Sequence, residues 1–250
     1  MFNVYPIAWV TKSITFMDFI RESTTDVHSE ERGQEFLVAD FASGEHDRVP
    51  SFFVRIVSDF LGELEQKKRT TVYSIDLHAL RLDSLLGKLE ESDLLERTRV
   101  VLAKLETMEN DAVLRPDLVT YLLQSPEAET WLDRILQTDQ RIPHESFDIG
   151  VLNTDVVGYL HEYYTEYSDA AVSLQQVYGT IKKDGLLIVT NPCSLYVVDN
   201  VKVLESVGFV FIEGTDIDLS SGRISPIDRK TPPESLSRLN HYSFLVFSKK

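Results

Sequence analysis

Short apolar runs alternate with longer amphipathic stretches along most of this chain, and that alternation constrains its fold more than any other feature. Each run is only four to six residues long, which is typical of a strand buried on both faces of a parallel sheet. The runs occupy residues 36–40, 71–76, 99–103, 147–152, 185–190, 209–212 and 242–247. We therefore predict an α/β fold built on a mostly parallel sheet.

The stretches between these runs place apolar residues at helical spacing. Helices are predicted over residues 51–67, 80–95, 163–181 and 197–207. Pro50 is favourable near the start of the first helix, and Gly208 is a favoured residue just after the last. In such a fold, helices cover both faces of the sheet and ligands bind beyond the carboxyl ends of the strands, where the strand order reverses.

Two regions interrupt this rhythm. Residues 1–35 are expected to form an N-terminal helical or irregular segment, followed by an α/β domain over residues 36–250. Residues 107–146, approximately, form a helical insertion within that domain. The insertion and a loop over residues 220–240 are expected to shape a binding pocket.

Charge and composition restrict the partners. The formal net charge is −15 and the sequence has no stripe of Lys and Arg, so a nucleic-acid substrate is unlikely on electrostatic grounds. The one basic segment, from Arg223 to Arg238, is interpreted as a solvated loop. No apolar run approaches the roughly 20 residues of a membrane helix. Cys193 is the only cysteine, which fits a reducing, cytoplasmic setting.

Residues 36–46 (FLVADFASGEH) are the first segment to resemble a known family, the class I S-adenosylmethionine-dependent methyltransferases. They are similar to the family's first motif, in which an apolar strand and an acid lead into a glycine-rich turn. Glycines there let backbone N–H groups approach a nucleoside closely. Only Gly44 keeps the pattern, because Ala42 and His46 stand where glycines are expected.

Three further segments carry the resemblance in the family's order. Asp76 ends the second predicted strand, where the family has an acid that accepts hydrogen bonds from both ribose hydroxyls. Residues 178–189 (YGTIKKDGLLIV) are similar to the family's turn into the fifth strand, and residues 203–209 (VLESVGF) to its junction before the sixth. The last predicted strand would be antiparallel.

The resemblance implies a Rossmann-like three-layer sandwich with a seven-stranded, mostly parallel sheet and an antiparallel last strand. It implies S-adenosylmethionine as the methyl donor, and a small molecule or a protein as the acceptor. The donor-binding residues it suggests are Asp40, Ala42, Gly44, Asp76, Glu106 and Asn153. Asp155 and His161 are the candidate catalytic residues, because a hydroxyl or ammonium acceptor needs a base.

Each of these residues also has an ordinary structural interpretation. Asp40 and Asp76 can simply end strands, Glu106 can be a solvated side chain, and the aromatic cluster Tyr159, Tyr163 and Tyr164 is more typical of core. The sequence shows no metal-binding motif of the HExxH type.

Two other functions stay open from the sequence. A catalytically inactive methyltransferase-like binding or partner protein would explain the loss of two glycines from the first motif. A nicotinamide-dependent oxidoreductase would share the initial strand, turn and helix, although the GxGxxG fingerprint is missing. The oligomeric state is also open, with a homodimer as one option.

Overall fold

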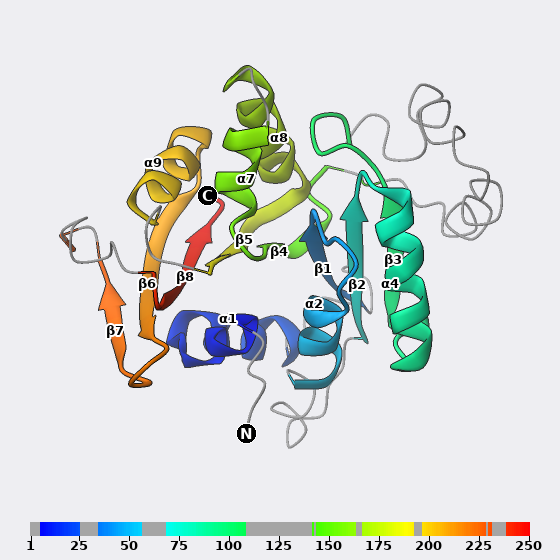
Figure 1. The fold of residues 1–250 in the computed structure, drawn as a ribbon, viewed down its shortest axis with the longest axis horizontal. Coiled ribbons are helices and arrows are strands. Elements are labelled where there is room, and N and C mark those ends of the chain that lie inside the picture. Colours follow the sequence, from blue (N-terminus) through cyan, green and yellow to red (C-terminus); the bar gives the residue numbers. More distant parts are fainter. Residues whose placement is uncertain are drawn as a thin grey trace.

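The computed structural model describes residues 6–25, 35–56, 69–108, 142, 144–163, 167–192, 197–228, 230–231 and 239–250. Its centre is one eight-stranded sheet in the order β3-β2-β1-β4-β5-β8-β6-β7 (Figure 1). The strands are β1 Glu35–Phe41, β2 Arg69–Asp76, β3 Thr98–Leu102, β4 Phe147–Leu152, β5 Ile181–Asn191, β6 Val210–Asp218, β7 Ile224–Ile227 and β8 His241–Ser248. Strands β1 to β5 pair in parallel, whereas β8 runs antiparallel to both β5 and β6.

Helices cover the two faces of the sheet as separate layers (Figure 1). On one face lie α7 Val156–Tyr163, α8 Tyr167–Thr180 and α9 Val197–Val207. On the other face lie η1 Pro6–Lys12, α1 Ile14–Thr25, α2 Arg48–Ser51 and the π-helical turn η2 Phe52–Ile56. Helix α4 Ala79–Glu91, followed by the short η3 Leu95–Arg97, packs beside β2 and β3.

Alternate residues of the strands feed two separate hydrophobic cores. Ala39 and Phe41 of β1 belong to the core under α7, α8 and α9, whereas Phe36 and Val38 belong to the core under the N-terminal helices. This is the period-two alternation of a strand buried on both faces. The described N-terminal residues contribute Ile7, Val10, Phe16, Met17 and Ile20 to the second core.

The structure confirms the α/β fold with an antiparallel last strand, but the sheet has eight strands instead of seven. The extra strand is β7, which lies within the predicted 220–240 loop and pairs with β6 as a hairpin. It is only four residues long and contains Pro226. Such a short edge strand with a central proline has almost no strand signature in sequence.

Two predicted element boundaries also move. The helix predicted over 163–181 corresponds to α8, which begins at Tyr167, and Ile181 already belongs to β5. Helix α7, which ends at Tyr163, was not predicted. The Lys182–Gly185 turn lies inside β5 as a bulge, where Asp184 has φ 62° and the pairing with β4 shifts register. Gly185 is required there, because a Cβ atom would lie 2.9 Å from the carbonyl oxygen of Asp148.

Some predictions fall outside the described residues. They include most of the 107–146 insertion and the second half of the predicted 51–67 helix, whose beginning is α2 followed by η2. None of the helices in the described ranges combines the length and apolar character needed to span a membrane.

Candidate functional site

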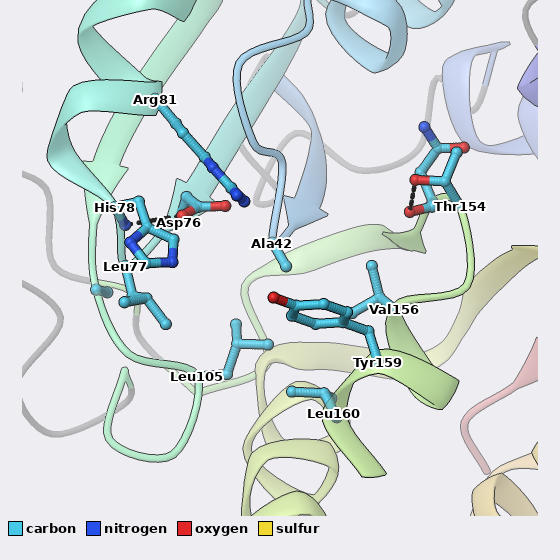
Figure 2. A pocket seen from close by; sticks show the side chains of 12 residues that line it. Ala42, Asp76, Leu77, His78, Arg81, Leu105, Thr154, Val156, Tyr159 and Leu160 are labelled. Atoms are coloured by element: carbon cyan, nitrogen blue, oxygen red, sulfur yellow. Dashed lines mark hydrogen bonds between the residues drawn. The ribbon is translucent and has the colours of Figure 1, made fainter. Parts of the chain in front are cut away.

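The strand order reverses between β1 and β4, and a cavity of about 190 Å³ lies at the carboxyl ends of β1 to β4. This is the location at which open α/β sheets bind their ligands. Figure 2 shows side chains converging on the cavity from the turns that follow these strands. The lining residues are Ala42, Asp76, Leu77, His78, Arg81, Ala103, Leu105, Asn153, Thr154, Val156, Tyr159 and Leu160.

The turn after β1 keeps a glycine-type backbone although it has lost a glycine. Ala42 has φ 56° and Gly44 has φ 64°, both in the left-handed region. Non-glycine residues occupy this region at a cost of roughly 1–2 kcal/mol. Ala42 stands where the resemblance expects a glycine and adopts a conformation that glycine favours, and its methyl group lines the cavity.

Asp76 holds this turn at the end of β2. Its carboxylate accepts hydrogen bonds from the backbone N–H of Gly44 at 2.9 Å and of His78 at 2.8 Å. A carboxylate has about four acceptor positions, so two are left for a ligand. Asp76 is 5% exposed and lines the cavity, and it is therefore buried, organised and accessible from one side.

Asp40, near Asp76, does not line the cavity. It is 2% exposed, and its Oδ1 atom has no hydrogen-bond partner in the described part of the structure. Burial, followed by the negative charge of Asp76, raises the pKa of Asp40 well above its usual range. A buried carboxyl oxygen without a hydrogen-bond partner costs folding free energy, which makes Asp40 a functional candidate.

The opposite wall of the cavity is largely apolar and comes from Leu105 and from Val156 and Leu160 of α7. Tyr159 projects from the same helix toward Ala42 (Figure 2). Its side chain is 53% exposed, so the core role expected from the sequence is wrong for this tyrosine. Arg81 extends from α4 toward Asp76 and is the only Lys or Arg in the described lining (Figure 2).

The turn after β4 is strained at two consecutive residues. Thr154 and Asp155 both have φ 64°. Asn153 and Thr154 line the cavity, whereas Asp155 does not. The carboxylate of Asp155 instead lies at the start of α7, where a Cβ on Gly158 would come within 2.8 Å of it, and it accepts a 3.4 Å hydrogen bond from Asn200.

Three other residues named from the sequence are not among the described lining residues. Glu106 directly follows the lining residue Leu105, and its Oε2 atom is buried without a partner among the described residues. His46, at a lost glycine position, is exposed and does not line the cavity. His161 is part of α7, but its side chain lies outside the described residues. Within the described ranges, no three His, Cys, Asp or Glu residues form a metal-binding cluster.

Comparisons with known proteins agree with this architecture. A putative sarcosine dimethylglycine methyltransferase from Galdieria sulphuraria aligns over 97% of this chain and 84% of its own, with a TM-score of 0.51 and 8% identity. The chain has the class I methyltransferase fold. A TehB-like SAM-dependent methyltransferase from Corynebacterium glutamicum aligns over 98% of this chain and 100% of its own, with a TM-score of 0.47 and 14% identity. No family model and no curated protein matches by sequence.

Sequence reasoning missed several residues that the structure brings to this edge. Arg81 and Tyr159 reach the cavity from the first turns of α4 and α7. The sequence signal that could have identified them is their position a few residues after the ends of β2 and β4. Thr190 and Asn200 contact the β4 turn from β5 and α9, far along the chain. No local pattern reveals such contacts.

Proposed function

We propose that this chain binds S-adenosylmethionine in the cavity and transfers its methyl group to a small molecule or a protein side chain. The observation that carries the proposal is Asp76, a buried carboxylate that lines the cavity and is oriented by two backbone N–H groups. Its free acceptor positions suit two neighbouring ribose hydroxyls. The net charge of −15 supports an acceptor other than nucleic acid.

The residues present fit an adenosyl group. The apolar wall of Leu77, Leu105 and Val156 suits a purine ring, and Ala42 allows close backbone approach because of its left-handed conformation. Asp40 and Gly44 at the first turn would hold the amino-acid end, with Glu106 and Asn153 contributing from the neighbouring strand ends. Asp40 does not itself line the cavity, so it would act on this end through the turn that follows it.

S-adenosylmethionine supplies an already activated methyl group, so the chain has mainly to align and desolvate the reactants. Such positioning can contribute roughly 7–11 kcal/mol to lowering a reaction barrier. The contact between Asp155 and Asn200 supports a role for Asp155 in shaping the β4 turn. Asp155 and His161, which is two residues beyond Tyr159 on α7, are the candidates for accepting a proton from the methyl acceptor.

Calorimetry with S-adenosylmethionine and S-adenosylhomocysteine tests donor binding directly. We expect both to bind, and Asp76→Asn to weaken binding more than about tenfold, since one charged hydrogen-bond pair is worth about 1.5–3 kcal/mol. Asp93→Asn is the matched control, because Asp93 is an exposed acid with φ 57°, a conformation that asparagine tolerates. Absence of heat and of thermal shift with both compounds would contradict the proposal.

The inactive-relative alternative was motivated by the glycine-poor first motif. Ala42 reproduces the glycine conformation and the cavity remains open, and both observations support donor binding. Release of S-adenosylhomocysteine above the acceptor-free background, across a panel of amines, phenols and carboxylates, distinguishes an enzyme from a binding protein.

A further inference from the structure

Thr190, near the end of β5, makes three hydrogen bonds to the strained turn after β4. Its hydroxyl donates to Oδ1 of Asn153 at 2.7 Å and accepts from the backbone N–H of Thr154 at 2.8 Å. Its carbonyl oxygen accepts from the N–H of Asp155 at 2.8 Å. Two residues of this turn have positive φ, and such strain persists only where surrounding contacts impose it. Thr190 provides these contacts.

These bonds determine which end of the Asn153 carboxamide faces a ligand. A threonine hydroxyl has one proton. The hydroxyl accepts from the Thr154 N–H and donates its proton to the Asn153 carboxamide oxygen, so that oxygen is held on Thr190. Asn153 lines the cavity, and no described residue accepts a hydrogen bond from its amide nitrogen. The nitrogen is the atom left to bind a ligand.

We propose that Thr190 is a positioning residue that fixes Asn153 as a hydrogen-bond donor to the ligand in the cavity. The inference rests on the proposed function in that it takes this cavity as the ligand site. It assigns the ligand atom at the end of β4 to one chemical class, an oxygen or nitrogen with a free lone pair. An ammonium group is excluded at that position, since it would meet another donor.

Thr190 acts only through its neighbours. It is fully buried and does not line the cavity, so it cannot touch the ligand itself. Asn200 supports the same turn from the other side through Asp155, and it also donates to Asn191 at 2.8 Å. The β4 turn is thus held from β5 and α9 together.

The test is the affinity of S-adenosylhomocysteine for a set of variants, measured by calorimetry. Thr190→Val removes the hydroxyl at nearly constant volume and should weaken binding about five- to tenfold, whereas Thr190→Ser should stay within about twofold of the unchanged chain. Asn153→Ala should weaken binding similarly. The double variant Asn153→Ala with Thr190→Val should bind no more weakly than Asn153→Ala alone, because both changes remove one interaction.

A matched control separates this effect from a general loss of stability. Thr180, next to the opposite end of β5, is also fully buried, and its hydroxyl donates to the Val177 carbonyl at 3.0 Å. Thr180→Val should lower thermal stability comparably without changing the affinity. Unchanged affinity in Thr190→Val, or additive losses in the double variant, would overturn the inference.

A second measurement needs no ligand. Hydrogen exchange at the Thr154 backbone amide should accelerate in Thr190→Val, because that N–H loses its acceptor. Unchanged exchange would overturn the positioning role even if binding fell. If the unchanged chain bound no S-adenosylhomocysteine, the proposed function would fail, and so would the ligand contact of Asn153. The exchange result would still decide whether Thr190 holds the turn.

Discussion

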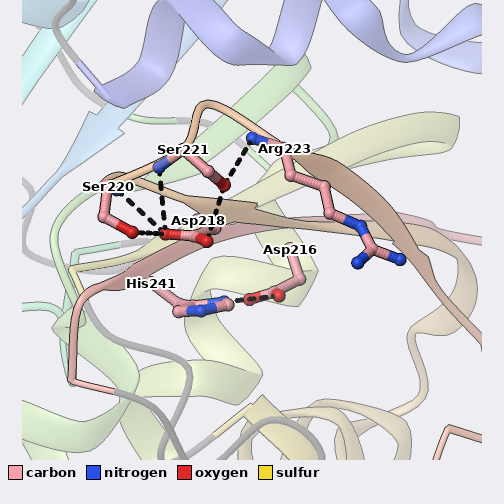
Figure 3. Close-up of polar contacts among 6 residues, drawn as sticks. All are labelled: Asp216, Asp218, Ser220, Ser221, Arg223 and His241. Carbon is pink, nitrogen blue, oxygen red and sulfur yellow. Dashed lines mark hydrogen bonds and ion pairs between the residues drawn. The ribbon is translucent and has the colours of Figure 1, made fainter.

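The two halves of the sheet end very differently at the same edge. At the carboxyl ends of β1 and β4, Ala42, Thr154 and Asp155 have positive φ, and Asp40 carries a buried oxygen without a partner among the described residues. At the β6–β8 end, two buried charged side chains form a pair, although the Tyr242 hydroxyl there is buried without a partner among the described residues. His241 Nδ1 lies 2.7 Å from Oδ2 of Asp216 across the two strands (Figure 3).

The turn after β6 extends this contrast. The Asp218 carboxylate accepts hydrogen bonds from the hydroxyls of Ser220 and Ser221, which hold the pKa of Asp218 below its usual range (Figure 3). One region therefore pairs its acidic side chains internally, whereas the other has strained turns and an Asp40 oxygen without a described partner close to a cavity. That difference indicates where a ligand contributes to the structure.

The largest expected effect is a loss of stability at the His241–Asp216 pair of the β6–β8 end. His241→Ala leaves Asp216 buried without its imidazole partner and should lower the free energy of unfolding by about 3–5 kcal/mol, measured by urea titration. Binding of S-adenosylhomocysteine should stay within about twofold. Adding Asp216→Asn should restore part of the stability. A selective loss of binding with little loss of stability would contradict the stabilising, non-binding role given to the β6–β8 end.

On the cavity side, Asp76→Ala should affect both stability and binding. Removing the acceptor of two backbone N–H groups should cost about 2–3 kcal/mol of unfolding free energy and abolish measurable donor binding. Urea titration and calorimetry on one preparation check both effects. Intact binding in this variant would show that the cavity does not use Asp76.

Asp40 should make stability depend on pH. Its pKa is raised in the folded protein by burial and by Asp76, so the folded state keeps a proton that the unfolded state has lost. Stability should therefore fall as pH rises from the ordinary carboxyl range through the raised pKa. Asp40→Asn should flatten this dependence, raise the melting temperature near neutral pH and weaken donor binding. Equal pH slopes in the two proteins would refute this account.

The smallest effect is expected at Ala42. Ala42→Gly removes left-handed strain but adds chain entropy to the unfolded state, for a net gain of about 0.5–1 kcal/mol in thermal unfolding. Ala103→Gly is the control, because Ala103 lines the same cavity without a positive φ and should lose stability. A loss in both variants would mean that the turn after β1 is not strained.

Much of the fold was predictable because it depends on local periodicity. The continuous apolar runs located the seven strands of the main sheet, and Gly208 marked the end of α9. Strand β7 was not predicted, because four residues that include a proline do not form a continuous apolar run. Helix α7 was also missed, because its eight residues make only about two turns and give a short periodic pattern.

The candidate site was predictable only where a residue ends a strand or directly follows one. Asp76, Ala42 and Asn153 were found in this way and line the cavity. Asp40 and Asp155, also named from their places near strand ends, do not line the cavity, because such a place does not fix the direction of a side chain.

The sequence by itself determined the layered sheet and the edge that carries the cavity, because burial on both faces imposes continuous apolar strands and parallel strands align their carboxyl ends. Only the tertiary structure decided which side chains line the cavity and which atom of Asn153 contacts Thr190. Those outcomes depend on contacts between residues distant in the chain, such as Thr190 with Asn153, which no local pattern encodes.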